Sequence, residues 1–259
     1  ASASTIDRIE VLFKGGTYIL NKPILLRPEH GGTAACPVVY RARDGKPPVF
    51  SGGRVISGWT VRPDGVWSAT LPEVKAGQWD FAQLFVNGQR RFRPRLPKQG
   101  YFVSVDDFEK TDSGINGFTY QSNDLDAAWA NLTDVEFHVL HVWSASRMRA
   151  ASIDPAIRAV RFPKTRPFNA YWSNFKNRRF WAENVKEAFG EPGEWYLNKP
   201  TGTLLYKPLP GETPGNTVIE APFLPQLLIF QGFENQPLVN TTIEGLVFRQ
   251  SQWVTPPDG

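Results

Sequence analysis

Glycine and proline residues cut the first 59 residues of this chain into very short β-prone stretches. The apolar stretch Ile9–Phe13 ends at Gly15-Gly16, and Tyr18–Leu20 and Ile24–Leu26 follow before a second break at Gly31-Gly32. A β-sandwich can contain such corners, but its strands are usually longer and alternate more regularly. Short strands at close spacing also fit a solenoid, in which each coil consists of several short strands joined by tight corners. The pattern predicts an all-β chain and leaves these two architectures open.

The composition excludes several functional classes. Cys36 is the only cysteine among the 259 residues, so an internal disulfide bond and a cysteine-based zinc site are excluded. The three histidines and the absence of clustered acidic residues give no support for a metal or cofactor site. The formal charge of +4 is small for this length, which argues against nucleic-acid binding. No apolar run reaches the ~18 residues that a membrane span requires.

The pattern of β-prone stretches changes over residues 59–218. This change predicts an inserted β-rich subdomain with one or two short helices. Asn87-Gly88 is a strong hairpin signal. Residues 135–146 read as one long strand, with an apolar face that continues into His141 and Trp143. Phe180–Phe189 reads as a helix, because its apolar residues share one helical face and Gly190 follows as a stop signal.

Residues 219–259 return to the pattern of residues 1–58, with short β-prone stretches separated by sharp corners. In Thr242–Phe248, the apolar residues face the same way only if Gly245 absorbs one residue as a bulge or a corner. A solenoid that stops at Pro256-Pro257-Asp258-Gly259 would expose an open end. We therefore expect this chain to be the front part of a longer protein, with its last coils truncated.

Several stretches, taken together and in order, resemble a known family. The opening coil carries the first of them, and the others follow along nearly the whole chain. They are Gly15–Leu20 with Pro23-Ile24, Pro37–Ala42 leading into Ser51-Gly52-Gly53 and Ile56–Trp59, Gln83–Arg90, Trp143–Arg147, Gly193–Leu197, Thr201–Tyr206 and Ile243–Phe248. This series resembles the N-terminal part of the β-helical glycoside hydrolases, and is most similar to glycoside hydrolase family 141.

The resemblance implies a fold and a function. It implies a right-handed parallel β-helix whose first coils are interrupted by an inserted β-rich subdomain. It also implies a secreted or periplasmic bacterial enzyme that acts on plant polysaccharide, with α-L-fucosidase and xylanase activities known in the family. Proteins of the family are much longer, and their catalytic acids lie in coils beyond the point where this chain ends.

No pair of carboxylates in the sequence can be assigned as catalytic. Glycoside hydrolysis requires an acid and a nucleophile or base at ~5–5.5 Å for retention or ~6.5–9.5 Å for inversion. The carboxylates of the returning coils are Glu220, Glu234, Glu244 and Asp258. Glu244 points away from the expected interior, as a catalytic group would, but a solvated surface glutamate does the same. The catalytic residues are therefore unassigned.

Four residues are candidates for contact with a carbohydrate. A tryptophan stacks on a sugar ring, and histidine and arginine bind hydroxyl or carboxylate groups, so His141, Trp143 and Arg147 could form one such site. Trp253 is a fourth candidate, in a loop after the last predicted strand. The alternatives are a core tryptophan at 143, a rim histidine at 141 and a lid residue at 253.

The arginines at 90, 91, 93 and 95 have two interpretations. Charged residues on an edge strand discourage aggregation, which is the simpler explanation. A binding site for an acidic polysaccharide is the alternative, and it would fit a polysaccharide lyase on the same scaffold. A lyase would release unsaturated products, a hydrolase would release reducing sugar without unsaturation, and a non-catalytic adhesion or binding solenoid would release nothing. We expect a glycoside hydrolase whose subdomain lines a carbohydrate cleft.

Overall fold

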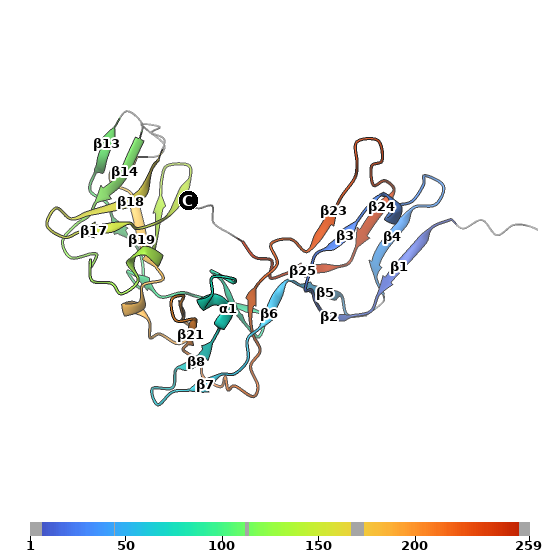
Figure 1. Cartoon of the computed structure of the whole chain (residues 1–259), viewed down its shortest axis with the longest axis horizontal. Helices are drawn as coiled ribbons and strands as arrows, with labels where there is room; N and C mark the ends of the chain where they lie inside the picture. Colours follow the sequence, from blue (N-terminus) through green and yellow to red (C-terminus); the bar gives the residue numbers. More distant parts are fainter. Residues whose placement is uncertain (1–6, 44, 112–113, 167–173, 254–259) are drawn as a thin grey trace, which may run out of the picture. The chain divides into compact units, whose positions relative to one another are not determined.

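The computed structural model describes residues 7–43, 45–111, 114–166 and 174–253, and the described chain is built almost entirely from β-strands (Figure 1). The all-β class predicted from the sequence is confirmed. Contacts divide the chain into two compact units. The first unit comprises Ala1–Ser57, Gln78–Arg90 and Val218–Val254, and the second comprises Gly58–Gly77, Arg91–Thr217 and Thr255–Gly259. The division into 1–58, 59–218 and 219–259 stays a prediction.

The first unit contains three short parallel sheets. β1 and β24 flank β4, β2 and β25 flank β5, and β3 pairs with β23. Each sheet therefore takes strands from successive turns of the chain, which is the pairing of stacked coils. The bounds are β1 Ile9–Phe13, β2 Gly16–Ile19, β3 Ile24–Leu26, the 3-10 helix η1 Pro28–His30, β4 Val38–Ala42, β5 Pro48–Ser51, β23 Leu228–Phe230, β24 Thr241–Glu244 and β25 Val247–Arg249.

An aromatic ladder holds these coils in register. Tyr18 of β2, Phe50 of β5 and Phe248 of β25 are paired across the sheet. The Phe50 ring stacks on Tyr18 at 5.1 Å and on Phe248 at 5.4 Å between centroids, and Phe13 meets it edge-on at 5.2 Å. Because Phe50 is buried, this contact removes apolar surface from water and adds aromatic pairing of about 0.5–1.5 kcal/mol per pair.

The chain leaves the second coil after β5 and returns to it at β23. β6 (Gly53–Val55) departs antiparallel to β22 (Ile219–Pro222), and these two strands form a four-stranded sheet with β9 (Leu84–Val86) and β10 (Gln89–Arg91). The hairpin predicted at Asn87-Gly88 joins β9 to β10, and both residues have positive φ. The insertion thus separates the second and third strands of one coil.

Gly245 makes the corner between two of these sheets. Its φ is +68°, and it lies between β24, which pairs with β4, and β25, which pairs with β5. A Cβ at this position would lie 3.2 Å from the Cβ of Ala42. The glycine therefore provides both the backbone conformation and the space that the corner requires, as the sequence predicted.

The second unit contains one sheet of two hairpins. The order is β20-β21-β8-β7, all antiparallel, and the turn around Asn198–Gly202 joins β20 to β21. A single helical turn, α1, follows β8 and leads to Gly77. The bounds are β7 Thr60–Val61, β8 Trp67–Thr70, α1 Pro72–Lys75, β20 Trp195–Asn198 and β21 Thr203–Tyr206.

Two further antiparallel sheets of the second unit enclose its largest core. One has the order β11-β19-β15-β16 with β12 also paired to β19, and the other has the order β13-β14-β18-β17. Phe118 is fully buried between them, 4.8–6.0 Å from four other phenylalanine rings. The bounds are β11 Arg95–Leu96, β12 Phe102–Val103, β13 Asp107–Thr111, β14 Gly114–Thr119, the 3-10 helix η2 Leu132–Asp134, β15 Glu136–Leu140, β16 Ala145–Arg149, β17 Ser152–Asp154, β18 Ala159–Arg166, β19 Arg179–Glu183 and the 3-10 helix η3 Lys186–Ala188.

The helix predicted at Phe180–Phe189 is wrong. Phe180 and Ala182 are buried while Trp181 between them is partly exposed, which is the alternation of the strand β19. Asn184 then has a φ of +67°, which ends the strand, and only η3 follows. The apolar spacing fits a helix only because a strand and a 3-10 turn follow one another.

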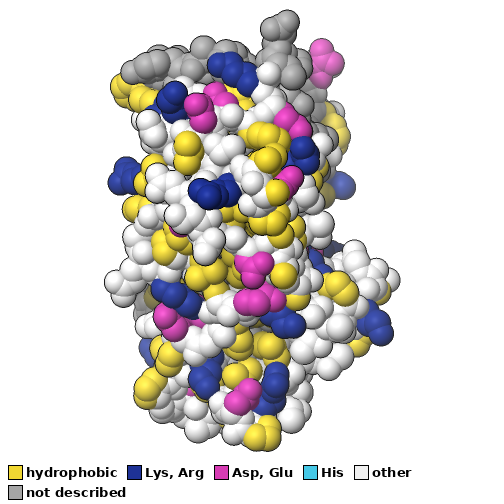
Figure 2. All heavy atoms as spheres, turned by 90° about the vertical axis from the view of Figure 1, so that its left-hand side faces the viewer, with side chains coloured by type: hydrophobic (Ala, Val, Ile, Leu, Met, Phe, Trp, Pro, Cys, Tyr) yellow, Lys and Arg dark blue, Asp and Glu magenta, His cyan; other side chains and the backbone are white. Residues whose placement is uncertain are grey.

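No helix of the described residues is long and apolar enough to cross a membrane. Figure 2 shows one face of the molecule, on which basic and acidic side chains are interspersed. This face has no broad patch of a single sign.

Gly202 offers a stability test for the second unit. Its φ is +69° and a Cβ there would lie 2.4 Å from the carbonyl oxygen of Leu71, whereas Gly211 has a φ of +87° with nothing within 4 Å of a Cβ. We expect Gly202→Ala to lower the free energy of unfolding by about 1–3 kcal/mol more than Gly211→Ala, because only the first adds a steric overlap to the strain of positive φ. Urea unfolding followed by tryptophan fluorescence measures the difference. Equal losses would show that the contact with Leu71 is relieved without cost.

Candidate functional site

The long strand predicted over residues 135–146 is a hairpin. β15 ends at Leu140, β16 begins at Ala145, and the His141 N–H donates to the Ser144 carbonyl across the turn at 2.8 Å. Trp143 therefore lies in the turn with 77% of its surface exposed, and it does not continue the apolar face of the strand. The interpretation of Trp143 as a core residue is also wrong.

His141 and Arg147 lie on opposite sides of this hairpin. The His141 ring contacts the Ser146 hydroxyl at 2.6 Å and lies 5.5 Å from the ring of Phe175, which is a core residue. Arg147 instead faces outward, where its Nε donates to Glu136 at 2.6 Å. Trp253 belongs to the first unit and is 54% exposed. The structure thus separates His141 from Arg147, and the carbohydrate-binding role of these four residues stays a prediction.

A buried charge network lies on the outward face of the sheet β11-β19-β15-β16. Glu136 of β15 is directly opposite Glu183 of β19, an arrangement in which two carboxylates repel each other. Arg93 lies against both of them: its Nε donates to Glu183 at 2.8 Å and its Nη2 donates to Glu136. Because Arg93 is only 8% exposed, it offsets the repulsion between the two carboxylates in a region with little water.

The network keeps both carboxylates ionised. Burial alone would raise the pKa of Glu136, but the Arg93 and Arg147 guanidinium groups outweigh it and lower the pKa to about 2. Burial likewise raises the pKa of Glu183, but Arg93 lowers it, and the net result is a lowered pKa. A catalytic acid of a glycosidase needs a raised pKa, so this pair does not fit the two-carboxylate chemistry.

A stack of rings and guanidinium groups extends from this network. The His138 ring lies parallel to the indole of Trp181 at 4.6 Å, and Arg95 lies 5.0 Å from the same indole. Tyr101 contacts Arg95 and Arg179 at 5.8 and 5.2 Å. Since His138 and Arg95 already contact Trp181, we interpret this stack as a stabilising element of the sheet rather than as a platform for a sugar ring.

The arginines at 90, 91, 93 and 95 do not form a charged, solvent-facing edge. β10 and β11 are edge strands, but Arg91 is buried, with its Nη2 2.7 Å from Glu212 and its Nε 3.1 Å from the Tyr206 hydroxyl. Arg93 is buried in the network described above, and of the four only Arg90 is fully exposed. The carboxylates that pair with Arg91 and Arg93 were not recognisable in the sequence, because they lie 43 to 121 residues away.

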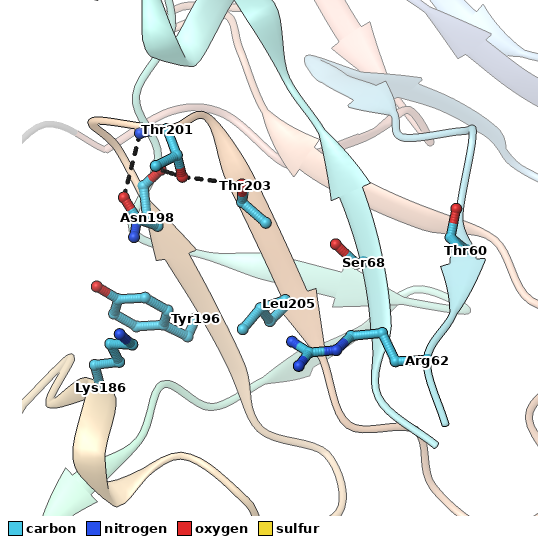
Figure 3. Close-up of a pocket in the computed structure, with 9 residues that line it drawn as sticks. All are labelled: Thr60, Arg62, Ser68, Lys186, Tyr196, Asn198, Thr201, Thr203 and Leu205. Carbon is cyan, nitrogen blue, oxygen red and sulfur yellow. Dashed lines mark hydrogen bonds between the residues drawn. The ribbon is translucent and has the colours of Figure 1, made fainter. Parts of the chain in front are cut away.

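An open pocket lies on the face of the sheet β20-β21-β8-β7 (Figure 3). It has a volume of about 570 Å³, within the ~300–1,000 Å³ range of ligand sites. Sequence reasoning missed it, because its residues come from four strands and η3 and share no motif. The lining residues are Thr60, Arg62, Ser68, Lys186, Tyr196, Asn198, Thr201, Thr203 and Leu205.

The pairing of the strands explains why these side chains meet. Tyr196, Leu205, Ser68 and Thr60 occupy one row across the four strands, and Asn198 and Thr203 are opposite each other in the next row. Lys186 comes from η3 beside the Tyr196 ring, and Arg62 extends from the end of β7 across the face toward Leu205 (Figure 3). Alternate residues of the same strands, including Trp67 and Tyr206, are buried on the other face.

The described part of the chain has no set of side chains suited to bind a metal ion. Residues 7–43, 45–111, 114–166 and 174–253 contain no group of three or more histidine, cysteine, aspartate and glutamate side chains that could hold a metal ion.

Comparison with known proteins identifies the family. The family model described as the GH141 insertion domain matches residues 64–209. This chain therefore belongs to glycoside hydrolase family 141 through its insertion domain, as its resemblance to that family predicted. No curated protein sequence matches the chain.

One solved structure agrees with the assignment to the glycoside hydrolases. A chain titled "Glycoside hydrolase" is 26% identical, with a TM-score of 0.80, and the match covers 96% of this chain and 44% of that chain. The present chain thus spans less than half the length of that relative. A structure titled "The complex structure of XylC with xylose" is 13% identical over 93% of this chain and 30% of that one, and its TM-score of 0.31 is too low to support an argument.

The charge network leads to a prediction about stability. We expect Arg93→Met to lower the free energy of unfolding by about 3–5 kcal/mol, because Glu183 loses its arginine partner and the buried Glu136 keeps only Arg147 and the more distant Arg149. Arg90→Met, at an exposed position, is the matched control and should change it by less than ~0.5 kcal/mol. Adding Glu136→Leu and Glu183→Leu to Arg93→Met should recover part of the loss. Urea unfolding measures all three variants, and equal effects at 90 and 93 would contradict the account.

His138 leads to a second prediction, about pH. Burial lowers the pKa of His138 to about 4, although Glu183 acts in the opposite direction. Between pH 6.5 and 4 the unfolded chain therefore binds a proton that the folded chain does not, so stability falls as the pH falls through this window. Thermal unfolding at pH 7 and pH 5 should show a smaller drop for His138→Gln than for the unmodified chain. An unchanged drop would mean that His138 is protonated in the folded state.

Proposed function

We propose that this chain is the N-terminal part of a secreted glycosidase that acts on plant polysaccharide, with a specificity like that of an α-L-fucosidase or a xylanase. One observation carries the proposal: the chain aligns over 96% of its length, with a TM-score of 0.80, to a protein titled "Glycoside hydrolase". The insertion-domain match over residues 64–209 supports it independently.

The stacked parallel sheets support the scaffold expected for such an enzyme. We propose that β1 to β5 and β23 to β25 form the first coils of a right-handed parallel β-helix. Successive strands of a parallel sheet lie ~4.8 Å apart, a spacing that allows carboxylates on neighbouring coils to form an acid and base pair. The insertion domain would then line a carbohydrate cleft.

The acid and base pair is proposed to lie outside these 259 residues. Glu136 and Glu183 are held ionised by Arg93, and Glu220 is buried and accepts a hydrogen bond from Gln250 at 2.8 Å. Glu244 is exposed on β24, opposite Arg41 of β4, as expected for a surface residue. The buried pairing of Arg91 and Arg93 also removes the feature that favoured a lyase.

An activity comparison tests the proposal. We expect the purified 259-residue chain to release no reducing sugar from xylan, fucosylated xyloglucan or pectin. The complete protein encoded by the gene should release reducing sugar without unsaturated ends. Product analysis by mass spectrometry distinguishes the outcomes.

Three results would contradict the proposal. Turnover by the 259-residue chain alone would place the catalytic pair within it. Unsaturated products from the complete protein would indicate a lyase. No product from any of the polysaccharides would indicate a non-catalytic binding protein.

A further inference from the structure

The pocket of Figure 3 combines two cations with a lining that contains no carboxylate. From this arrangement we infer that the second unit binds an acidic oligosaccharide in this pocket, with a sugar carboxylate at Lys186 or Arg62 and sugar hydroxyls along the sheet face. The inference rests on the proposed carbohydrate function. It assigns a class of ligand to this pocket, which is separate from the proposed acid and base pair.

The charges of the pocket are not neutralised within the protein. Lys186 forms no ion pair with any described residue, and the acidic groups near it are engaged elsewhere. Asp134 pairs with Lys199 at 2.7 Å, and Glu187 accepts the Ala130 N–H at 3.0 Å. Arg62 has the carboxylate of Asp64 at 3.7 Å, but both side chains are about half exposed, so this pair is weak. The site therefore favours an anion.

Several polar groups of the pocket keep hydrogen-bonding capacity for a ligand. Ser68 and Thr60 donate no side-chain hydrogen bond to any described residue, so both hydroxyl groups are available to a ligand. The side-chain oxygen of Asn198 accepts the Thr201 N–H at 3.2 Å, and Figure 3 shows its amide nitrogen turned away from Thr201. Such donors and acceptors match the alternating hydroxyl groups of a sugar chain.

The floor of the pocket is less polar and well supported. Tyr196 and Leu205 are neighbours across the β20-β21 hairpin, and Tyr196 is buried. Burial raises the pKa of the Tyr196 hydroxyl to about 12, so it keeps its proton at neutral pH. The partly exposed Leu205, supported by the buried Tyr196, therefore supplies the apolar contact, and the neighbouring hydroxyl and amide groups fix the orientation of a ligand.

Three features thus act on one ligand. Each of the two cations can bind a carboxylate through charge-assisted hydrogen bonds, the hydroxyl and amide groups select a polyhydroxylated ligand, and the floor contacts the less polar side of a ring. A simple anion would use only the first feature, and a neutral oligosaccharide would lack it. An oligosaccharide of uronic acids uses all three.

Calorimetry on the full 259-residue chain tests this inference. The ligands are tetragalacturonate, neutral xylotetraose, and citrate as a simple anion. Lys186→Met and Arg62→Met remove the two pocket cations. Lys22→Met and Arg90→Met are matched controls, because both positions are exposed in the first unit and each variant changes the net charge by the same amount.

We expect tetragalacturonate to bind more tightly than xylotetraose or citrate. Each pocket variant should weaken tetragalacturonate binding about tenfold, which corresponds to ~1.4 kcal/mol. The control variants should bind like the unmodified chain, and added salt should weaken binding.

Other outcomes would overturn the inference. Equal affinities for the three ligands, or equal losses in pocket and control variants, would mean that net charge alone attracts the ligand. Binding of xylotetraose alone would show a neutral glycan site. Absence of binding would also overturn it, and would leave the hydrolase proposal intact, because that proposal is decided by product release from the complete protein.

Discussion

The contact of Phe50 with Tyr18 and Phe248 is the interaction on which the first unit depends. The three rings come from successive coils, and the second of these coils is interrupted between β5 and β23 by a long segment that contains most of the second unit. A coil tolerates such an insertion only if its strands keep their register when the chain returns. Buried ring stacking and the corner at Gly245 set that register again in the returning strands β24 and β25.

The second unit differs from the first in that it buries charged side chains beside its β-sheets. Arg93 pairs with carboxylates of the distant strands β15 and β19, and Arg91 pairs with Glu212 in the segment between β21 and β22. Removing one partner from a network of this kind costs more than the network itself contributes. Arg91 and Arg93 are thus engaged with carboxylates inside the second unit, whereas Lys186 forms no ion pair with a described residue and Arg62 has only a half-exposed contact with Asp64.

Local features of the sequence predicted much of the fold. Asn87-Gly88 and Gly245 act through their own backbone conformations, so short motifs were sufficient. The prediction of a helix at Phe180–Phe189 was wrong because Asn184 adopts a positive φ, which the neighbouring residues do not indicate. The candidate site could not be predicted in the same way. His141 and Arg147 were separated by a turn, and the pocket unites residues 60 to 205, which only the pairing of the strands brings together.

The central claim is that the insertion domain provides a carbohydrate-contacting surface of its own. A crystal structure of the 259-residue chain with a bound uronic-acid oligosaccharide tests it most directly. The account predicts a sugar carboxylate within hydrogen-bonding distance of Lys186 or Arg62, and sugar hydroxyls beside Ser68 and Asn198 on the face of the sheet β20-β21-β8-β7. An oligosaccharide bound elsewhere, with this face empty, would contradict it.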